Sequence, residues 1–111
     1  MVAGPLRELF HPDIGWYAPA AASWPATTRG VDTVLGYFGR TIGVTGGSFR
    51  VEVHDVVAND EHGVGLNSVH AEREGRTLED NNTLVFHIRD GTVTEVWQYW
   101  ADQYAADDLF S

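Results

Sequence analysis

The chain from Ser48 to Trp100 consists almost entirely of strand-like sequence, and this feature most constrains the fold. Four stretches rich in β-branched and aromatic residues follow one another: FRVEVHDVV, VGLNSVHAERE, TLVFHIR and TVTEVWQYW. Asp90-Gly91 separates the last two and is a strong signal for a two-residue hairpin, because both residue types accept a positive φ. Residues 73–76, REGR, form a weaker signal of the same kind. An antiparallel meander is therefore predicted.

Helical sequence precedes these strands. The stretch VDTVLGYF, which begins at Val31, places apolar residues at i, i+3, i+4 and i+7 and an acidic residue in its first turn. A shorter helix is expected over residues 5–10, followed by a strand at 14–17 and a loop at 18–30. The closing stretch DQYAADDLFS, residues 102–111, is interpreted as a polar, acidic tail that Tyr104, Leu109 and Phe110 could anchor. Residues 1–111 are predicted to be a single α+β domain, with the helices packed on one face of a curved sheet.

The two turns predict which side chains share a face. Pairing outward from residues 73–76 places Asn67 opposite Asn82. Pairing outward from Asp90-Gly91 places Asn82 opposite Tyr99, and Leu84 opposite Trp97. This face is the more apolar, so we expect the helices to cover it, although a slip of one residue would exchange the two faces. The outer face would carry His87 with five apolar residues: Val64, Leu66, Val85, Val96 and Trp100.

Asn67, Asn82 and Tyr99 would form a polar row on the otherwise apolar inner face. Leaving such groups unpaired costs about 1–3 kcal/mol each, so each needs a partner. They either bond one another or an ordered water and fix the register, or they face a cavity and hold a polar atom of a ligand. The sequence leaves both interpretations open.

Composition excludes several classes of function. The chain has seven basic residues, all arginine and scattered, against 16 acidic residues, which gives a net charge of −9 and argues against nucleic-acid binding. The absence of cysteine excludes disulfides and thiolate chemistry, and the absence of lysine excludes Schiff bases. No apolar run approaches the ~18 residues of a membrane span. We expect a cytoplasmic bacterial protein that needs no metal and no cofactor.

The order of six segments resembles the SnoaL-like branch of the nuclear-transport-factor-2-like superfamily over nearly the whole chain. These segments are LRELFHPDI, RGVDTVLGYFGR, FRVEVHDVVANDEH, AEREGRTLED, VFHIRDGTVTEVW and ADQYAADDLF. The resemblance implies a cone-shaped fold in which a strongly bent antiparallel sheet and helices enclose an apolar cavity, commonly in a dimer formed through the sheet. The family normally has a long helix ahead of LRELF, which this sequence does not show. Either the chain begins late, or the cavity is open on that side.

Family members include polyketide cyclases, ketosteroid-isomerase-like enzymes, limonene-epoxide-hydrolase-like enzymes and non-catalytic binders. The isomerase base would fall near Ala18, and no arginine of the epoxide-hydrolase type can be placed on the inner face. A cyclase-type pair would have to come from Asp80 and His87, which the predicted register puts on opposite faces.

We therefore predict a domain that binds a small apolar metabolite and that forms a homodimer through the outer face of the sheet. The alternative is a lyase, isomerase or cyclase acting on a polyketide- or terpenoid-like substrate, with Asp80 or His87 as acid/base. The predicted ligand contacts are Trp16, Asn67, Asn82, Leu84, Phe86, Trp97 and Tyr99.

Overall fold

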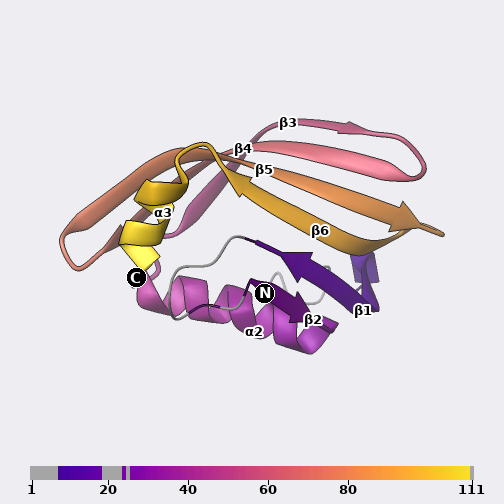
Figure 1. Cartoon of the computed structure of the whole chain (residues 1–111), viewed down its shortest axis with the longest axis horizontal. Helices are drawn as coiled ribbons and strands as arrows, with labels where there is room; N and C mark the ends of the chain where they lie inside the picture. Colours follow the sequence, from indigo (N-terminus) through magenta and orange to yellow (C-terminus); the bar gives the residue numbers. More distant parts are fainter. Residues whose placement is uncertain (1–7, 19–23, 25, 111) are drawn as a thin grey trace.

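The computed structural model describes residues 8–18, 24 and 26–110. Six strands form one sheet in the order β2-β1-β6-β5-β4-β3, and β1 pairs with β6 in parallel while every other pair is antiparallel. Figure 1 shows the long strands curving over α2, with α3 closing one end. The elements are β1 (Phe10–Tyr17), β2 (Thr27–Arg29), α2 (Val31–Val44), β3 (Arg50–Ala58), β4 (His62–Arg73), β5 (Arg76–Arg89), β6 (Thr92–Trp100) and α3 (Gln103–Phe110). The predicted α+β class with a curved sheet is confirmed, although the sheet is mixed rather than purely antiparallel.

Helix α2 forms where the sequence predicts it and extends further, to Val44. Gly30 precedes it at φ 90°, a conformation that glycine adopts without strain. Val34 on its inner side is fully buried and packs with Ile14 and Val96, which come from β1 and β6. This cluster fixes α2 against the β1 end of the sheet.

The N-terminal predictions need correction. Phe10 to Pro12 belong to β1 rather than to a helix that ends at His11-Pro12. Residues 5–7 of the predicted helix lie outside the described residues, residues 8 and 9 are helical, and the predicted strand at 14–17 lies within β1. Pro12 is tolerated because β1 and β6 lose register between Phe10 and Gly15, so no ladder hydrogen bond is needed from it. The predicted loop 18–30 also contains a short edge strand, β2, which pairs with the end of β1.

The predicted polar tail forms helix α3, and of its three expected anchors Leu109 and Phe110 pack into the core, whereas Tyr104 is 89% exposed. Ala106 and Leu109 on this helix are buried against Ala71 and Leu78 of the sheet. Asp102 caps the helix by accepting a hydrogen bond from the backbone N–H of Ala105 at 3.1 Å. This packing seals one end of the concave side of the sheet.

The predicted pairing of β4 with β5 is confirmed at every position, including Asn67 opposite Asn82. The hairpin between β5 and β6 begins as predicted, with Ile88 opposite Val93. A bulge next to this pair then shifts β6 by one residue, so that His87 lies opposite Glu95. The extra residue bends the strand and exchanges the faces of everything that follows it in β6.

Beyond the bulge, the predicted pairing of β5 with β6 is therefore wrong. Leu84 lies opposite Gln98 rather than Trp97, and Asn82 lies opposite Trp100 rather than Tyr99. Val96, Gln98 and Trp100 face inward, whereas Trp97 and Tyr99 face outward. None of the described helices is long and apolar enough to cross a membrane.

Candidate ligand-binding cavity

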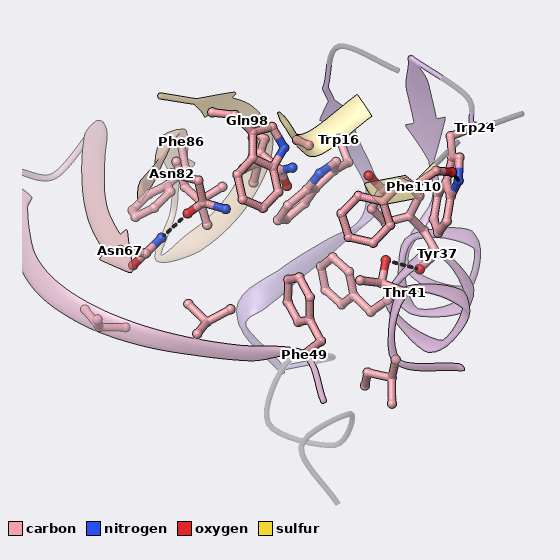
Figure 2. A pocket seen from close by; sticks show the side chains of 18 of the residues that line it. Trp16, Trp24, Tyr37, Thr41, Phe49, Asn67, Asn82, Phe86, Gln98 and Phe110 are labelled. Atoms are coloured by element: carbon pink, nitrogen blue, oxygen red, sulfur yellow. Dashed lines mark hydrogen bonds between the residues drawn. The ribbon is translucent and has the colours of Figure 1, made fainter. Parts of the chain in front are cut away.

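A cavity of about 820 Å³ lies between the concave face of the sheet and the two helices. Its wall is mostly aromatic and aliphatic, and Figure 2 shows side chains from the sheet and both helices converging on it. Trp16 packs edge-to-face on Phe38 of α2, with ring centroids 4.9 Å apart. Trp24 is held at the α3 end by a hydrogen bond from its Nε1 to the backbone oxygen of Phe110, at 2.9 Å. The cavity wall is thus built from packed, oriented rings.

Asn67 and Asn82 form a hydrogen-bonded pair in this apolar wall. The Nδ2 atom of Asn67 donates to the Oδ1 atom of Asn82 at 2.9 Å, and the two residues are only 5% and 6% exposed (Figure 2). They come from neighbouring strands whose register places them directly opposite each other. The pairing uses the Nδ2 atom of Asn67 and the Oδ1 atom of Asn82.

Each amide, in the wall of the cavity, also has one polar atom that the pairing leaves unused. Asn82 Nδ2 and Asn67 Oδ1 make no hydrogen bond with any described residue, and neither is among the fully enclosed unpaired atoms. Turning both amides over would leave the same result, because the pair always retains one free donor and one free acceptor. The pair therefore keeps one unused donor group and one unused acceptor group, which lie at its two opposite ends (Figure 2).

Two further polar groups of the wall lack a described partner. The indole Nε1 of Trp16 is enclosed and unpaired. The amide of Gln98 lines the cavity and makes no hydrogen bond with the described part of the chain. An unpaired polar group in an apolar environment is destabilising, and of these two groups only the Gln98 amide is open to a molecule that enters the cavity.

The structure brings five of the seven predicted ligand contacts together at the cavity: Trp16, Asn67, Asn82, Leu84 and Phe86. Trp97 and Tyr99 do not line it, because the bulge turns both to the outer face. Gln98 and Trp100 take their places. The prediction also missed Trp24, Tyr37 of α2 and Phe110 of α3, which only the tertiary packing brings to the cavity.

Neither predicted acid/base group lines the cavity. Asp80 uses its Oδ2 atom to accept the backbone N–H of Asp102 at 2.8 Å, just ahead of α3. His87 lies on the outer face, as predicted, with its Nδ1 atom 3.5 Å from Glu95 Oε1 and its ring 4.9 Å from that of His62. Asp80 thus supports the turn into α3, and His87 belongs to an outer-face cluster.

This outer-face cluster continues onto β1 and β2. Tyr17 stacks on Trp97 with ring centroids 5.3 Å apart, donates to Glu95 Oε2 at 3.0 Å, and accepts from Arg29 Nη2 at 2.7 Å. Burial and the neighbouring Glu95 carboxylate raise the pKa of Tyr17, and Arg29 opposes that shift. These groups lie on the side of the sheet opposite the cavity.

Asp107 is the only carboxylate among the described residues of the cavity wall, and it accepts from Gln103 Nε2 at 2.7 Å. Tyr37 lines the same end, and burial raises its pKa while Arg40 opposes the shift. No cluster of three histidine, aspartate or glutamate residues that could hold a metal ion occurs within the described ranges.

The comparisons with known proteins agree with the resemblance seen in the sequence. The SnoaL-like domain family matches residues 3–96. An uncharacterized protein of Mycobacterium tuberculosis is 25% identical over 107 residues, which cover 96% of this chain and 82% of that protein.

Two solved structures are similar to the whole described fold. Bal32a, from a soil-derived mobile gene cassette, has a TM-score of 0.91 and 28% identity over 97% of this chain and 83% of its own. TerC, co-crystallized with polyporic acid, has a TM-score of 0.82 and 19% identity over 96% of this chain and 84% of its own. The second of these likenesses shows the fold alone.

Proposed function

Because the chain belongs to the SnoaL-like domain family, within the nuclear-transport-factor-2-like superfamily, we propose that it binds a small, mostly apolar metabolite inside the cone. The observation that carries this proposal is the Asn67–Asn82 pair, which keeps one free donor and one free acceptor in an otherwise apolar wall. An apolar cavity with a few convergent polar groups is the usual form of a small-molecule site.

The size and lining of the cavity support this proposal. Its volume of about 820 Å³ lies within the range of about 300–1,000 Å³ typical of ligand sites. Aromatic rings such as Trp16, Phe38 and Phe86 offer large apolar contact areas to a flat hydrophobic molecule. TerC, a neighbour in fold, was co-crystallized with the small organic molecule polyporic acid.

Binding without chemistry fits the positions of the titratable groups better than catalysis by the predicted pair. A general acid or base must come within about 2.6–3.2 Å of the reacting group, directly or through one water. Asp80 is engaged at the start of α3, and His87 lies across the sheet from the cavity. Neither residue lines the cavity.

If the cavity does carry out acid/base chemistry, Asp107 is the group that the geometry favours, because its carboxylate lines the wall. Such an enzyme would lose turnover in Asp107→Asn while keeping its affinity for the substrate. Turnover that survived this substitution would show that Asp107 is not the acid/base group, whereas a wild type without turnover would support the non-catalytic function.

We also propose that two copies associate through the outer face of the sheet. Val57, Leu66 and Tyr99 are 64%, 37% and 51% exposed on that face. Trp97 adds a large ring there, whereas the Val96 and Trp100 of the predicted interface lie on the cavity side. A contiguous apolar surface of this kind is typical of an interaction face.

The binding proposal is tested by melting wild type, Asn82→Leu and Asn81→Leu with a panel of small apolar ketones, lactones and phenols. Asn81 is the matched control, because it is the neighbouring asparagine on β5 but is exposed on the outer face. We expect some compounds to raise the melting temperature of wild type and Asn81→Leu but not of Asn82→Leu. A panel that shifts none of the three, or that shifts Asn82→Leu equally, would contradict the proposal.

A further inference from the structure

His62 and His87 form a cross-strand pair on the outer face of the sheet, which is the face opposite the cavity. They lie directly opposite each other on β4 and β5. The next pair, Glu61 and Ile88, carries a hydrogen bond from the Ile88 N–H to the Glu61 backbone oxygen at 2.7 Å, so the two histidines occupy a non-hydrogen-bonded position of the ladder. Side chains at such positions approach each other closely, with Cβ atoms about 4.5–5.5 Å apart. The sheet therefore holds two imidazoles together without ordering any loop.

The spacing of the two rings suits two ligands of one metal ion. Their centroids lie 4.9 Å apart, and their planes are inclined at 80°. Imidazole nitrogens bind Zn²⁺ at about 2.0–2.1 Å, which puts the ring centroids of two such ligands about 4.5–5.2 Å apart for square-planar or tetrahedral angles at the metal. Small rotations of the two side chains are therefore enough for both rings to share an ion.

Glu95 is placed to orient one of these rings. Its Oε1 atom lies 3.5 Å from the Nδ1 atom of His87, at the outer limit of a hydrogen bond, which leaves Nε2 as the ring nitrogen open to a metal. Glu95 is itself fixed, because its Oε2 atom accepts the Tyr17 hydroxyl at 3.0 Å and Arg29 Nη2 donates to that hydroxyl at 2.7 Å. A carboxylate beside the second ring nitrogen is the usual support of a metal-binding histidine, since it fixes the ring and makes the other nitrogen more basic.

The histidine pair is open to solvent and lies in an acidic hollow. His62 is exposed, and the side chain of His87 is 43% exposed. Residues 59–62, 87–91, 94 and 95 line the hollow, and they include four carboxylates but only one guanidinium. The excess of negative charge attracts cations to this surface. An ion reaches the pair from water without entering the cavity.

We propose, against the expectation from the sequence, that His62 and His87 bind a divalent transition-metal ion of the kind that favours imidazole, such as Cu²⁺, Ni²⁺ or Zn²⁺. The two histidines are the ligands, and Glu95 is a positioning residue. No group of three metal ligands occurs among the residues that the structure describes, so water or a donor from another molecule completes the coordination.

The nature of the two ligands sets the order of affinities. Cu²⁺ should bind most tightly, because it leads the series of divalent ions at nitrogen ligands. Mg²⁺ prefers oxygen ligands and should not bind to the pair. The site lies across the sheet from the cavity, so the inference is independent of the ligand-binding function proposed above.

The test is a calorimetric titration of the protein, without a histidine tag, with Cu²⁺, Ni²⁺ and Mg²⁺. The variants are His62→Gln, His87→Gln and His70→Gln. His70 is the matched control, because it lies on the same face of β4 and contacts the Glu79 carboxylate at 3.0 Å but has no histidine opposite. We expect wild type and His70→Gln to bind Cu²⁺ and Ni²⁺ equally, and the other two variants to bind both ions at least 10-fold more weakly. Mg²⁺ should bind to none of them.

Two further readouts show where the metal binds. The ring of His87 lies 4.6 Å from that of Trp97, so Cu²⁺ should quench the emission of Trp97, identified by its loss in Trp97→Phe. The unfolded chain does not hold the two histidines together, so Ni²⁺ should raise the midpoint of urea unfolding for wild type and His70→Gln but not for His62→Gln or His87→Gln.

The role of Glu95 has its own test. Glu95→Gln should lower the affinity for Cu²⁺, while electron paramagnetic resonance should still show two coordinated imidazole nitrogens, as in wild type. A spectrum with fewer nitrogens in Glu95→Gln than in wild type would contradict the positioning role. Circular dichroism confirms that every variant is folded.

Three outcomes would overturn the proposed site. If wild type binds neither Cu²⁺ nor Ni²⁺, the two rings only pack against each other. If His62→Gln or His87→Gln keeps the wild-type affinity, the metal binds elsewhere. If Mg²⁺ binds as tightly as Ni²⁺, the negative charge of the surface holds the ions and the imidazoles do not.

Discussion

The Nδ2 atom of Asn67 lies 2.9 Å from the Oδ1 atom of Asn82, and this contact joins β4 to β5 inside an apolar cavity. Both residues are almost fully buried, yet each amide keeps one polar atom, Asn67 Oδ1 or Asn82 Nδ2, that makes no hydrogen bond with the described protein. A pair that served only to fix the register would gain stability from using that capacity. The arrangement is therefore better suited to a group that is bound and released.

Because Asn67 and Asn82 bond each other, we predict that the effects of substituting them on the free energy of unfolding do not add. Asn67→Val alone leaves the Asn82 amide without its partner and should lower the free energy of unfolding by about 1–3 kcal/mol. The double variant Asn67→Val with Asn82→Leu replaces both polar groups by apolar ones and should lose less than the single variant. Urea unfolding of the two single variants and the double variant gives the coupling. A double variant that lost the sum of the two single effects would contradict this interpretation.

Two glycines give a matched test of the packing. A side chain at Gly63 would collide with the ring of Phe86, which lines the cavity, whereas Gly36 on the exposed side of α2 has open space around it. Gly63→Ala should therefore lower the unfolding free energy by about 1–3 kcal/mol through overpacking. Gly36→Ala should raise it by up to about 1 kcal/mol, because alanine favours the helix. Thermal and urea unfolding measure both, and equal effects of the two substitutions would contradict the described packing of Phe86.

The sequence predicts the β4 and β5 part of the cavity wall correctly and the β6 part incorrectly, and the difference has a physical reason. The turn at residues 73–76 determines the β4–β5 register, with Glu74 and Gly75 at positive φ as a two-residue hairpin requires. In β6, however, the stretch VWQYW places aromatic residues on both faces, whichever way it is read. The hydrophobic pattern could not reveal the bulge, and one extra residue was enough to exchange Trp97 for Gln98.

The parallel contact between β1 and β6 was equally beyond local reasoning. It joins segments about 80 residues apart in the chain, as in the pair Trp16 and Val96, and no turn links them. Helix α3 was different, because its buried Ala106 and Leu109 are spaced at i and i+3, a helical signal present in the sequence but masked by the acidic residues around it.

Substitution of Asp80 distinguishes a structural role of its carboxylate from a catalytic one. Its carboxylate accepts the backbone N–H of Asp102, which in turn caps α3. Asp80→Ala should lower the unfolding free energy by about 0.5–2 kcal/mol, the range seen when a helix cap is lost. It should leave the affinity for cavity ligands unchanged in a fluorescence titration. If Asp80→Ala kept its stability but lost ligand binding or turnover, Asp80 would belong to the functional site.

From the exposed apolar side chains on the outer face of the sheet we predict a dimer that an added carboxylate on this face would disrupt. Leu66→Asp places a carboxylate in the exposed apolar surface formed with Val57 and Tyr99, and burying it at an interface is unfavourable. Light scattering at micromolar concentration should give a dimer for wild type and a shift towards monomer for Leu66→Asp. Thr33→Asp on the exposed side of α2 adds the same charge elsewhere and should remain a dimer. A monomeric wild type would refute the proposed association.

We predict that the protein loses stability at alkaline pH as the buried hydroxyl of Tyr37 loses its proton. Burial raises the pKa of its hydroxyl in the folded protein above the ordinary value of 10.0, with Arg40 opposing the shift. A raised folded-state pKa means that the contribution to stability is complete below the unfolded pKa and is lost as the pH rises through the folded pKa. Tyr37→Phe should therefore lose less stability than wild type between pH 9 and about 11.

Urea unfolding at several pH values across that range measures the difference, with Tyr104→Phe as the control because Tyr104 is 89% exposed on α3. Some alkaline dependence should persist in Tyr37→Phe, since burial and Glu95 also raise the pKa of Tyr17. If Tyr37→Phe and Tyr104→Phe both follow the wild-type pH profile, the Tyr37 hydroxyl is not shielded from water. The aromatic end of the cavity, at Trp24 and Phe110, would then be more open to water than its ring packing indicates.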